Sequence, residues 1–115
     1  MGIRQGRVFS YDEALALFPA VRELTAASVR ELAALGGDSA GDEAAEAGDA
    51  ELEGPRRQVV ERWTREIEAL GCEVKGLWLV DWDAGDGYFC WRHPEPALAH
   101  YHGYEEGFAG RVPIA

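Results

Sequence analysis

The spacing of apolar residues along this chain changes once, close to Gly76. Over residues 17–35 and 59–70, apolar positions recur every three or four residues, which is the period of an α-helix. After Gly76 they alternate with a period of two, which is typical of half-buried strands. A helical part followed by a β part predicts the α+β fold class.

The first helical region begins at a capping box. In Ser10-Tyr11-Asp12-Glu13, the serine can cap the third amide while the glutamate reaches back to the amide of the serine. Because Pro19 disfavours helical geometry at the residue before it, we predict a short helix ending near Leu17 and a new helix with Pro19 in its first turn. One helical stripe is formed by Leu17, Val21, Leu24, Ser28 and Leu32.

Another helix is expected between Pro55 and Gly71. Its apolar face would carry Val59, Val60, Trp63, Ile67 and Leu70. Residues 36–55, between the helical regions, hold seven acidic residues and almost nothing that can be buried. We predict a flexible acidic loop there, with an interaction tail for a basic partner as the alternative. Residues 10–71 thus predict a long antiparallel helical hairpin.

Three strands are predicted in residues 72–115, at Leu77–Trp82, Tyr88–Arg92 and Ala97–His102. Residues 83–87 and 93–96 are rich in glycine, aspartate and proline and form the turns between them. The prediction is a three-stranded antiparallel β-meander with a C-terminal tail, packed against the helical hairpin in a single domain of residues 1–115.

Helices can cover only one face of such a sheet. The other face would expose aromatic side chains, and an exposed apolar patch favours self-association. In the expected register these side chains are Trp78, Trp82, Tyr88 and Tyr101. A homo-oligomer is therefore the expected assembly.

Charge and hydropathy exclude other partners. The net charge of −10 lacks the basic footprint that nucleic acids or anionic lipids need. No apolar run approaches the ~20 residues of a membrane span, and the N-terminus lacks the apolar core of a signal peptide. These features predict a cytoplasmic protein with both cysteines reduced.

Donors suited to zinc or iron gather near the C-terminus, at Cys90, His93, Glu95, His100 and His102. His100 and His102 would share one face of a strand, and Asp81 joins them if the hairpins close symmetrically about residues 85 and 94–95. In that register Cys90 points to the opposite face. The candidate metal ligands are therefore Asp81, His100 and His102, although their spacing matches no established zinc signature.

The same register separates Cys90 from His102 as a nucleophile and its base, and no recognisable catalytic motif remains. Asp81, Glu95, His102 and Arg111 form a candidate polar cluster. It can provide an acid and a base, or it can be a structural network in which His102 is a core histidine held by a carboxylate.

A candidate anion-binding loop contains Gly107, Gly110 and Arg111, because glycines expose backbone amides and arginine adds a forked donor. The alternative is a tail packed by Phe108, with Arg111 paired to an acid.

The chain resembles the uncharacterised prokaryotic domain-of-unknown-function family 2203 over nearly all its length. The resemblance rests on the segments 9–14, 17–19, 79–82, 90–92, 95–96, 101–102 and 107–113. It implies that the family's motif positions include Asp81, Cys90, Trp91, Glu95, His102 and Arg111, and it brings no known activity, substrate or cofactor.

Three functions are consistent with these patterns. The first is a non-catalytic binding or assembly module that acts as a homo-oligomer. The second is a ligand-binding protein or enzyme that uses the Asp/Glu/His/Arg cluster on the sheet. The third is a metal-binding protein with zinc or iron as the cofactor.

Overall fold

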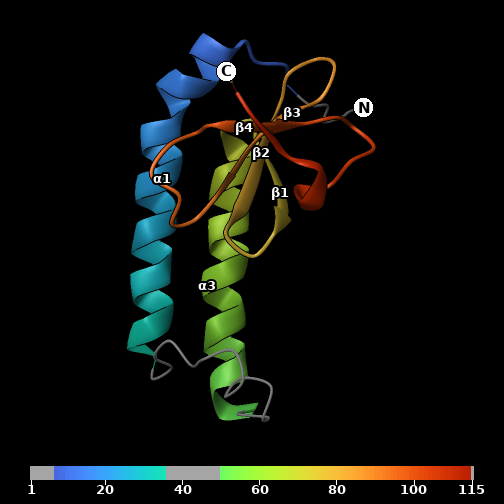
Figure 1. Ribbon diagram of the computed structural model, residues 1–115. Helices are drawn as coiled ribbons and strands as arrows, with labels where there is room; N and C mark the ends of the chain where they lie inside the picture. The colour runs from blue at the N-terminus through green and yellow to red at the C-terminus, as the bar shows by residue number, and fades with distance from the viewer. Residues whose placement is uncertain (1–6, 36–49, 115) are drawn as a thin grey trace.

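Two long helices lie side by side and run in opposite directions (Figure 1). The computed structural model describes residues 7–35 and 50–114, in which helix α1 spans Tyr11–Ala34 and helix α3 spans Ala50–Ala69. An ion pair between Glu31 and Arg62 links the two helices. The predicted antiparallel pair of helices is therefore present.

The capping box forms at the start of α1. The Glu13 amide donates to Ser10 Oγ at 3.0 Å, and the Ser10 amide donates to Glu13 Oε1 at 2.9 Å. The predicted break at Pro19 is wrong, because α1 continues through this residue. Phe18 is buried while Pro19 is exposed, so the helical bond that proline removes lies on the solvent side, where water can satisfy the free carbonyl.

Helix α3 begins earlier than predicted. Its first residue is Ala50, and Pro55 lies inside the helix instead of starting it. Residues 50–55 of the predicted acidic loop are therefore helical, and residues 36–49 lie outside the described part of the chain. Pro55 is the sixth residue of α3, past the first turn, so the helix lacks one backbone hydrogen bond at this exposed position.

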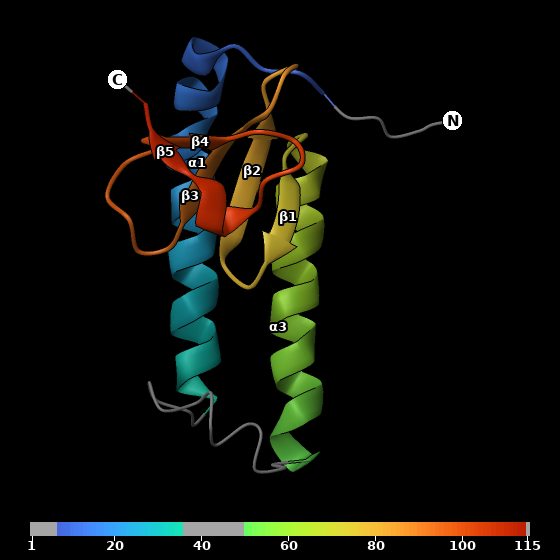
Figure 2. The same cartoon turned by 45° about the vertical axis from the view of Figure 1, so that its right-hand side comes forward.

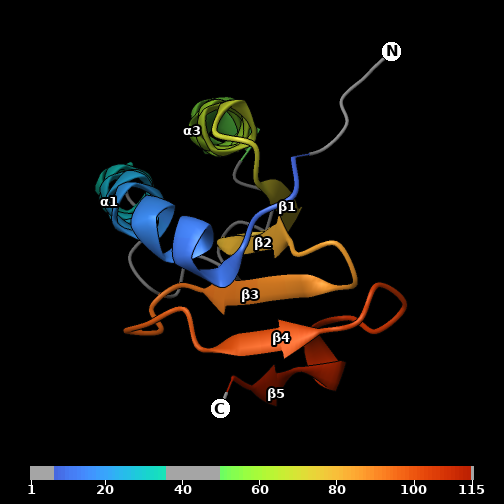
Figure 3. The same ribbon diagram turned by 90° about the horizontal axis from the view of Figure 1, so that it is seen from above.

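The sheet has five antiparallel strands in chain order, not three: β1 Glu73–Gly76, β2 Leu79–Asp83, β3 Tyr88–Arg92, β4 His100–His102 and β5 Val112–Pro113. Figure 3 shows the strands following one another away from the helices. Strand β1 was missed because its four residues are mostly polar, and β5 because it has only two residues, one of them proline. Trp78 has a φ of 61° in the β1–β2 turn, so β2 begins after the predicted Leu77.

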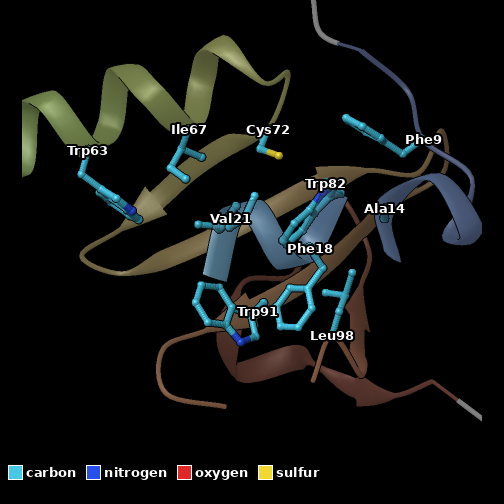
Figure 4. Close-up of a cluster of buried hydrophobic side chains, with 11 residues drawn as sticks. Phe9, Ala14, Phe18, Val21, Trp63, Ile67, Cys72, Trp82, Trp91 and Leu98 are labelled. Atoms are coloured by element: carbon cyan, nitrogen blue, oxygen red, sulfur yellow. The ribbon is translucent and has the colours of Figure 1, made fainter. Parts of the chain in front are cut away.

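The core lies between the helices and one face of the sheet (Figure 4). Side chains from both layers are fully buried there, among them Val21, Trp63, Ile67, Trp82 and Trp91. The indole of Trp63 donates to Thr25 Oγ1 at 2.9 Å, which satisfies a polar atom inside this core.

The aromatic patch predicted from the sequence is not formed. Trp82 is in the core, and Trp78 packs edge-on against Trp63 with ring centroids 4.8 Å apart. Tyr88 lies on the other face of the sheet, beside His102 and Tyr104. Self-association therefore loses the observation that suggested it, and it stays a prediction.

The face of the sheet away from the helices is partly covered by the chain between β4 and β5. This segment contains the short helix η1, Phe108–Gly110, and passes in front of β2 and β3 (Figure 2). Within the described ranges, no helix combines the length and the apolar character that crossing a membrane requires.

Candidate functional site

The pairing of the central strands places Asp81, Cys90 and His102 on one face. Asp81 lies opposite Cys90, Cys90 lies opposite His100, and Tyr88 lies opposite His102. Side chains alternate along a strand, so these residues point away from the helices while Val80, Trp82 and Trp91 point toward them. The predicted separation of Cys90 from His102 is wrong. The β3–β4 register centres on residue 95 instead of 94–95, which brings Cys90 to the face of His102. The β2–β3 register centres between residues 85 and 86 instead of on residue 85, which brings Asp81 to the same face.

Asp81 and His102 form a buried pair. His102 Nε2 lies 2.9 Å from Asp81 Oδ2, and His102 Nδ1 lies 2.8 Å from the carbonyl oxygen of Gly103. A carbonyl can only accept, so Nδ1 carries a proton, and a second proton must lie between Nε2 and Oδ2. Burial raises the pKa of Asp81, although the neighbouring Cys90 and His102 side chains work in the opposite direction.

Cys90 completes a compact group with this pair. The ligand atoms of Asp81, Cys90 and His102 all lie within 4.8 Å of one another, and all three residues are buried. Burial, followed by the charge of Asp81, raises the pKa of the Cys90 thiol to about 12. Arg111 only partly offsets this effect, so Cys90 is a neutral thiol and a poor nucleophile at neutral pH.

Lys75 on strand β1 brings a second basic side chain close to Asp81. Its Nζ lies 3.8 Å from Asp81 Oδ2, 3.4 Å from Glu73 Oε1 and 3.9 Å from the centre of the Tyr88 ring. Burial opposes the charge on Lys75, but Asp81, Tyr88 and Glu73 outweigh it and raise the pKa of the amine. Lys75 was not among the residues predicted from the sequence, because β1 itself was not predicted.

A cleft of about 440 Å³ opens above this group. Its floor is formed by Asp81, Cys90 and His102, and the remaining lining residues are Lys75, Leu79, Tyr104, Glu105, Glu106, Gly107 and Phe108. Asp81 is only 1% exposed, and its Oδ1 has no hydrogen-bond partner among the residues that the structure describes. A buried polar atom of this kind is uncommon in native proteins and calls for an explanation.

Glu95 and Arg111 form a second pair. Arg111 donates to both carboxylate oxygens of Glu95, at 3.0 and 2.7 Å, and its guanidinium lies 4.0 Å from the centre of the Phe108 ring. Burial disfavours the charge on Glu95, but hydrogen bonds from Arg111 and from the Arg92 amide outweigh it and lower the pKa of Glu95. This geometry is that of the alternative in which the C-terminal tail packs through Phe108 and pairs Arg111 with an acid.

The four residues of the predicted polar cluster therefore form two pairs. Asp81 and His102 line the cleft, whereas Glu95 and Arg111 do not. Cys90 connects the pairs, because its thiol interacts with both Asp81 and Arg111.

The remaining predicted site residues are placed differently. In the candidate anion loop, the amides of Gly110 and Arg111 donate to the carbonyls of Gly107 and Phe108, so an anion would have to displace these bonds and Glu95. Among the candidate metal ligands, Asp81 and His102 lie together, but His100 is not part of the compact group. The third member of the compact group is Cys90 instead of His100. Only the exact strand register could have predicted this.

Comparison with known proteins identifies one family. The model of an uncharacterised conserved protein family, DUF2203, matches residues 7–114. No curated protein and no solved structure matches the chain.

Proposed function

Since the chain belongs to the uncharacterised conserved family DUF2203, we propose a function from the geometry of the cleft: it is a binding protein for a small polar ligand. The observation that supports this most is Asp81 Oδ1, which is buried at the floor of the cleft without a hydrogen-bond partner. The proposed ligand supplies that partner, either as an N–H or O–H donor or as a cation.

The free energy of the site supports this proposal. Leaving a buried acceptor without a partner costs roughly 1–3 kcal/mol, and more when the acceptor is charged. A ligand that reaches Asp81 recovers this free energy, and the lining includes both charged residues and apolar ones such as Leu79 and Phe108. A few polar groups among apolar side chains are characteristic of small-molecule sites.

The test blocks the cleft without touching its floor. A Cβ at Gly107 meets no heavy atom within 4 Å, and Gly107 lines the cleft, so Gly107→Trp places a large ring at the opening. Gly54→Trp is a matched control, because Gly54 is exposed on α3 and its Cβ also meets nothing. The probes are methylammonium, acetamide, imidazole and Zn²⁺, followed through the backbone amide signals of Asp81, Cys90 and His102 in NMR spectra.

At least one probe should shift these signals saturably in the wild-type protein and in Gly54→Trp. The same probe should bind Gly107→Trp more than about tenfold more weakly, a loss of 1.4 kcal/mol or more. If no probe binds, or if all three proteins respond alike, the cleft is not a binding site. Self-association is a separate expectation, and sedimentation at micromolar concentration tests it.

A further inference from the structure

We propose that the floor of the cleft is a binding site for a divalent transition-metal ion, held by the Asp81 carboxylate, the Cys90 sulfur and His102 Nε2. This inference rests on the proposed function, because it names the class of ligand that enters the cleft. The three ligands come from β2, β3 and β4, which are neighbouring strands of one sheet. Strand pairing therefore holds the ligands at fixed positions.

The separation of the three ligand atoms suits a tetrahedral metal. They lie within 4.8 Å of one another, and Nε2 and Oδ2 are 2.9 Å apart. Metal–ligand distances of about 2.0–2.3 Å put tetrahedral ligands roughly 3.3–3.8 Å from each other. The side chains therefore need to move by only about an ångström. A sulfur, a nitrogen and an oxygen donor together favour zinc, cobalt or ferrous iron over magnesium or calcium.

The surroundings of His102 are those of a metal ligand. Its Nδ1 donates to the Gly103 carbonyl at 2.8 Å, which fixes the ring and turns Nε2 toward Asp81 and Cys90. Metal-bound histidines usually donate their other ring N–H to a carbonyl or carboxylate in this way. An ion would replace the proton between Nε2 and Oδ2. Asp81 Oδ1, which has no hydrogen-bond partner, would be available to the ion or to a water on it.

The charges of the site balance for a dication. The Asp81 carboxylate and a Cys90 thiolate supply two negative charges, and Arg111, which interacts with the thiol, favours the thiolate. Lys75 opposes the ion from 3.8 Å, but its side chain is 36% exposed and can turn toward solvent. Three protein ligands leave one coordination position facing the cleft, an arrangement typical of catalytic zinc sites and not of closed structural ones.

Cobalt binding tests this site directly. Co²⁺ is added to the reduced, tag-free full-length protein, and the thiolate-to-cobalt charge-transfer band and the ligand-field bands of tetrahedral cobalt are recorded. One equivalent should saturate both sets of bands, and Zn²⁺ should displace the cobalt. Cys90→Ser should abolish the charge-transfer band, whereas Cys72→Ala should retain it, because Cys72 lies in the core on the helix side of the sheet.

Two further variants keep the test informative if Cys90→Ser does not fold. Asp81→Asn keeps the shape of the side chain and can still bond His102, yet it should weaken cobalt binding by about 100-fold or more, beyond the usual effect of losing a supporting residue. Lys75→Gln should tighten cobalt binding because it removes a like charge. A band that persists in Cys90→Ser, Asp81→Asn binding cobalt as tightly as the wild type, or Lys75→Gln binding it no tighter, would each contradict the site.

The outcomes also separate this inference from the proposed function. If an organic probe enters the cleft but cobalt gives no charge-transfer band, the cleft binds a ligand and the metal site is wrong. If neither cobalt nor any organic probe binds, both proposals are wrong.

Discussion

Asp81 is a buried carboxylate whose position in the sheet costs the fold stability. A carboxylate that is almost fully buried loses the solvation of water, and here one oxygen is bonded to His102 while the other has no hydrogen-bond partner. Cys90, His102 and Lys75 offset only part of this loss, since the pKa of Asp81 remains raised. Replacing a buried charged pair by well-packed apolar residues often leaves a protein equally or more stable, so a ligand explains the presence of Asp81 here better than folding does.

Glu95 behaves in the opposite way, because its charge stabilises the fold. Glu95→Gln removes one partner of the bidentate pair with Arg111, and it should lower the free energy of unfolding by roughly 1–3 kcal/mol at pH 7. Arg111 holds the pKa of Glu95 below its ordinary value of 4.5. The stabilisation is therefore complete above that value and is lost as the pH falls through the lower pKa of the folded state.

Urea unfolding of both proteins between pH 7 and pH 3 measures this effect. The difference between wild type and Glu95→Gln should be constant near neutral pH and shrink below about pH 4.5. A difference that does not depend on pH would show that the amide disturbs packing and that the ion pair has no role. Glu66→Gln is the matched control, because Glu66 is exposed on α3. Glu13→Gln is unsuitable, because it alters the capping box.

The site residues could be predicted from the sequence only in part. The sequence predicts one polar cluster of charged side chains in an aromatic sheet, made of Asp81, Glu95, His102 and Arg111. In the structure these residues form two pairs, Asp81 with His102 and Glu95 with Arg111. The expected register puts Cys90 on the wrong face because strand parity depends on the exact closing points of both hairpins. Composition places the turns at residues 83–87 and 93–96 but does not resolve a shift of half a residue.

At the level of elements, local rules failed where tertiary packing opposed them. Pro19 predicted a helix break, yet Ala14, Phe18 and Val21 bury one continuous face of α1 against the rest of the core. Burial of that face outweighs the single helical hydrogen bond that proline removes. Strands β1 and β5 could not be predicted for the related reason that pairing with β2 and β4, not their own sequence, holds them.

Pro19→Ala should therefore stabilise the protein. The exposed position tolerates alanine, the missing amide is restored, and the free energy of unfolding should rise by roughly 1–3 kcal/mol. Chemical denaturation followed by circular dichroism measures the change. Ala16→Gly, also exposed on α1, should instead lower stability by about 1 kcal/mol. A destabilised Pro19→Ala would mean that the proline sets a bend that the core requires.

On the scale of the whole molecule, the helices and the sheet share one set of buried side chains. Val21 comes from α1, Ile67 from α3, and Trp82 and Trp91 from the sheet, and all four are fully buried in the same cluster (Figure 4). Neither layer can bury its apolar face without the other. The polar site lies on the opposite face of the same strands, so its geometry depends on this core through the backbone of β2 and β3.

Ile67→Ala tests this dependence. Removing a fully buried isoleucine side chain should cost roughly 2–5 kcal/mol, whereas the exposed Arg65→Ala on the same helix should change stability by less than about 0.5 kcal/mol. Far-ultraviolet circular dichroism reports mainly on the helices. In a Trp63→Phe background, which removes the tryptophan of α3, fluorescence reports on the tryptophans in and beside the sheet, Trp78, Trp82 and Trp91. Because both layers share the core, the two signals should move to the same lower midpoint in Ile67→Ala. Separate midpoints would show that the helices unfold without the sheet. The geometry of the cleft would then depend on the sheet and not on the shared core.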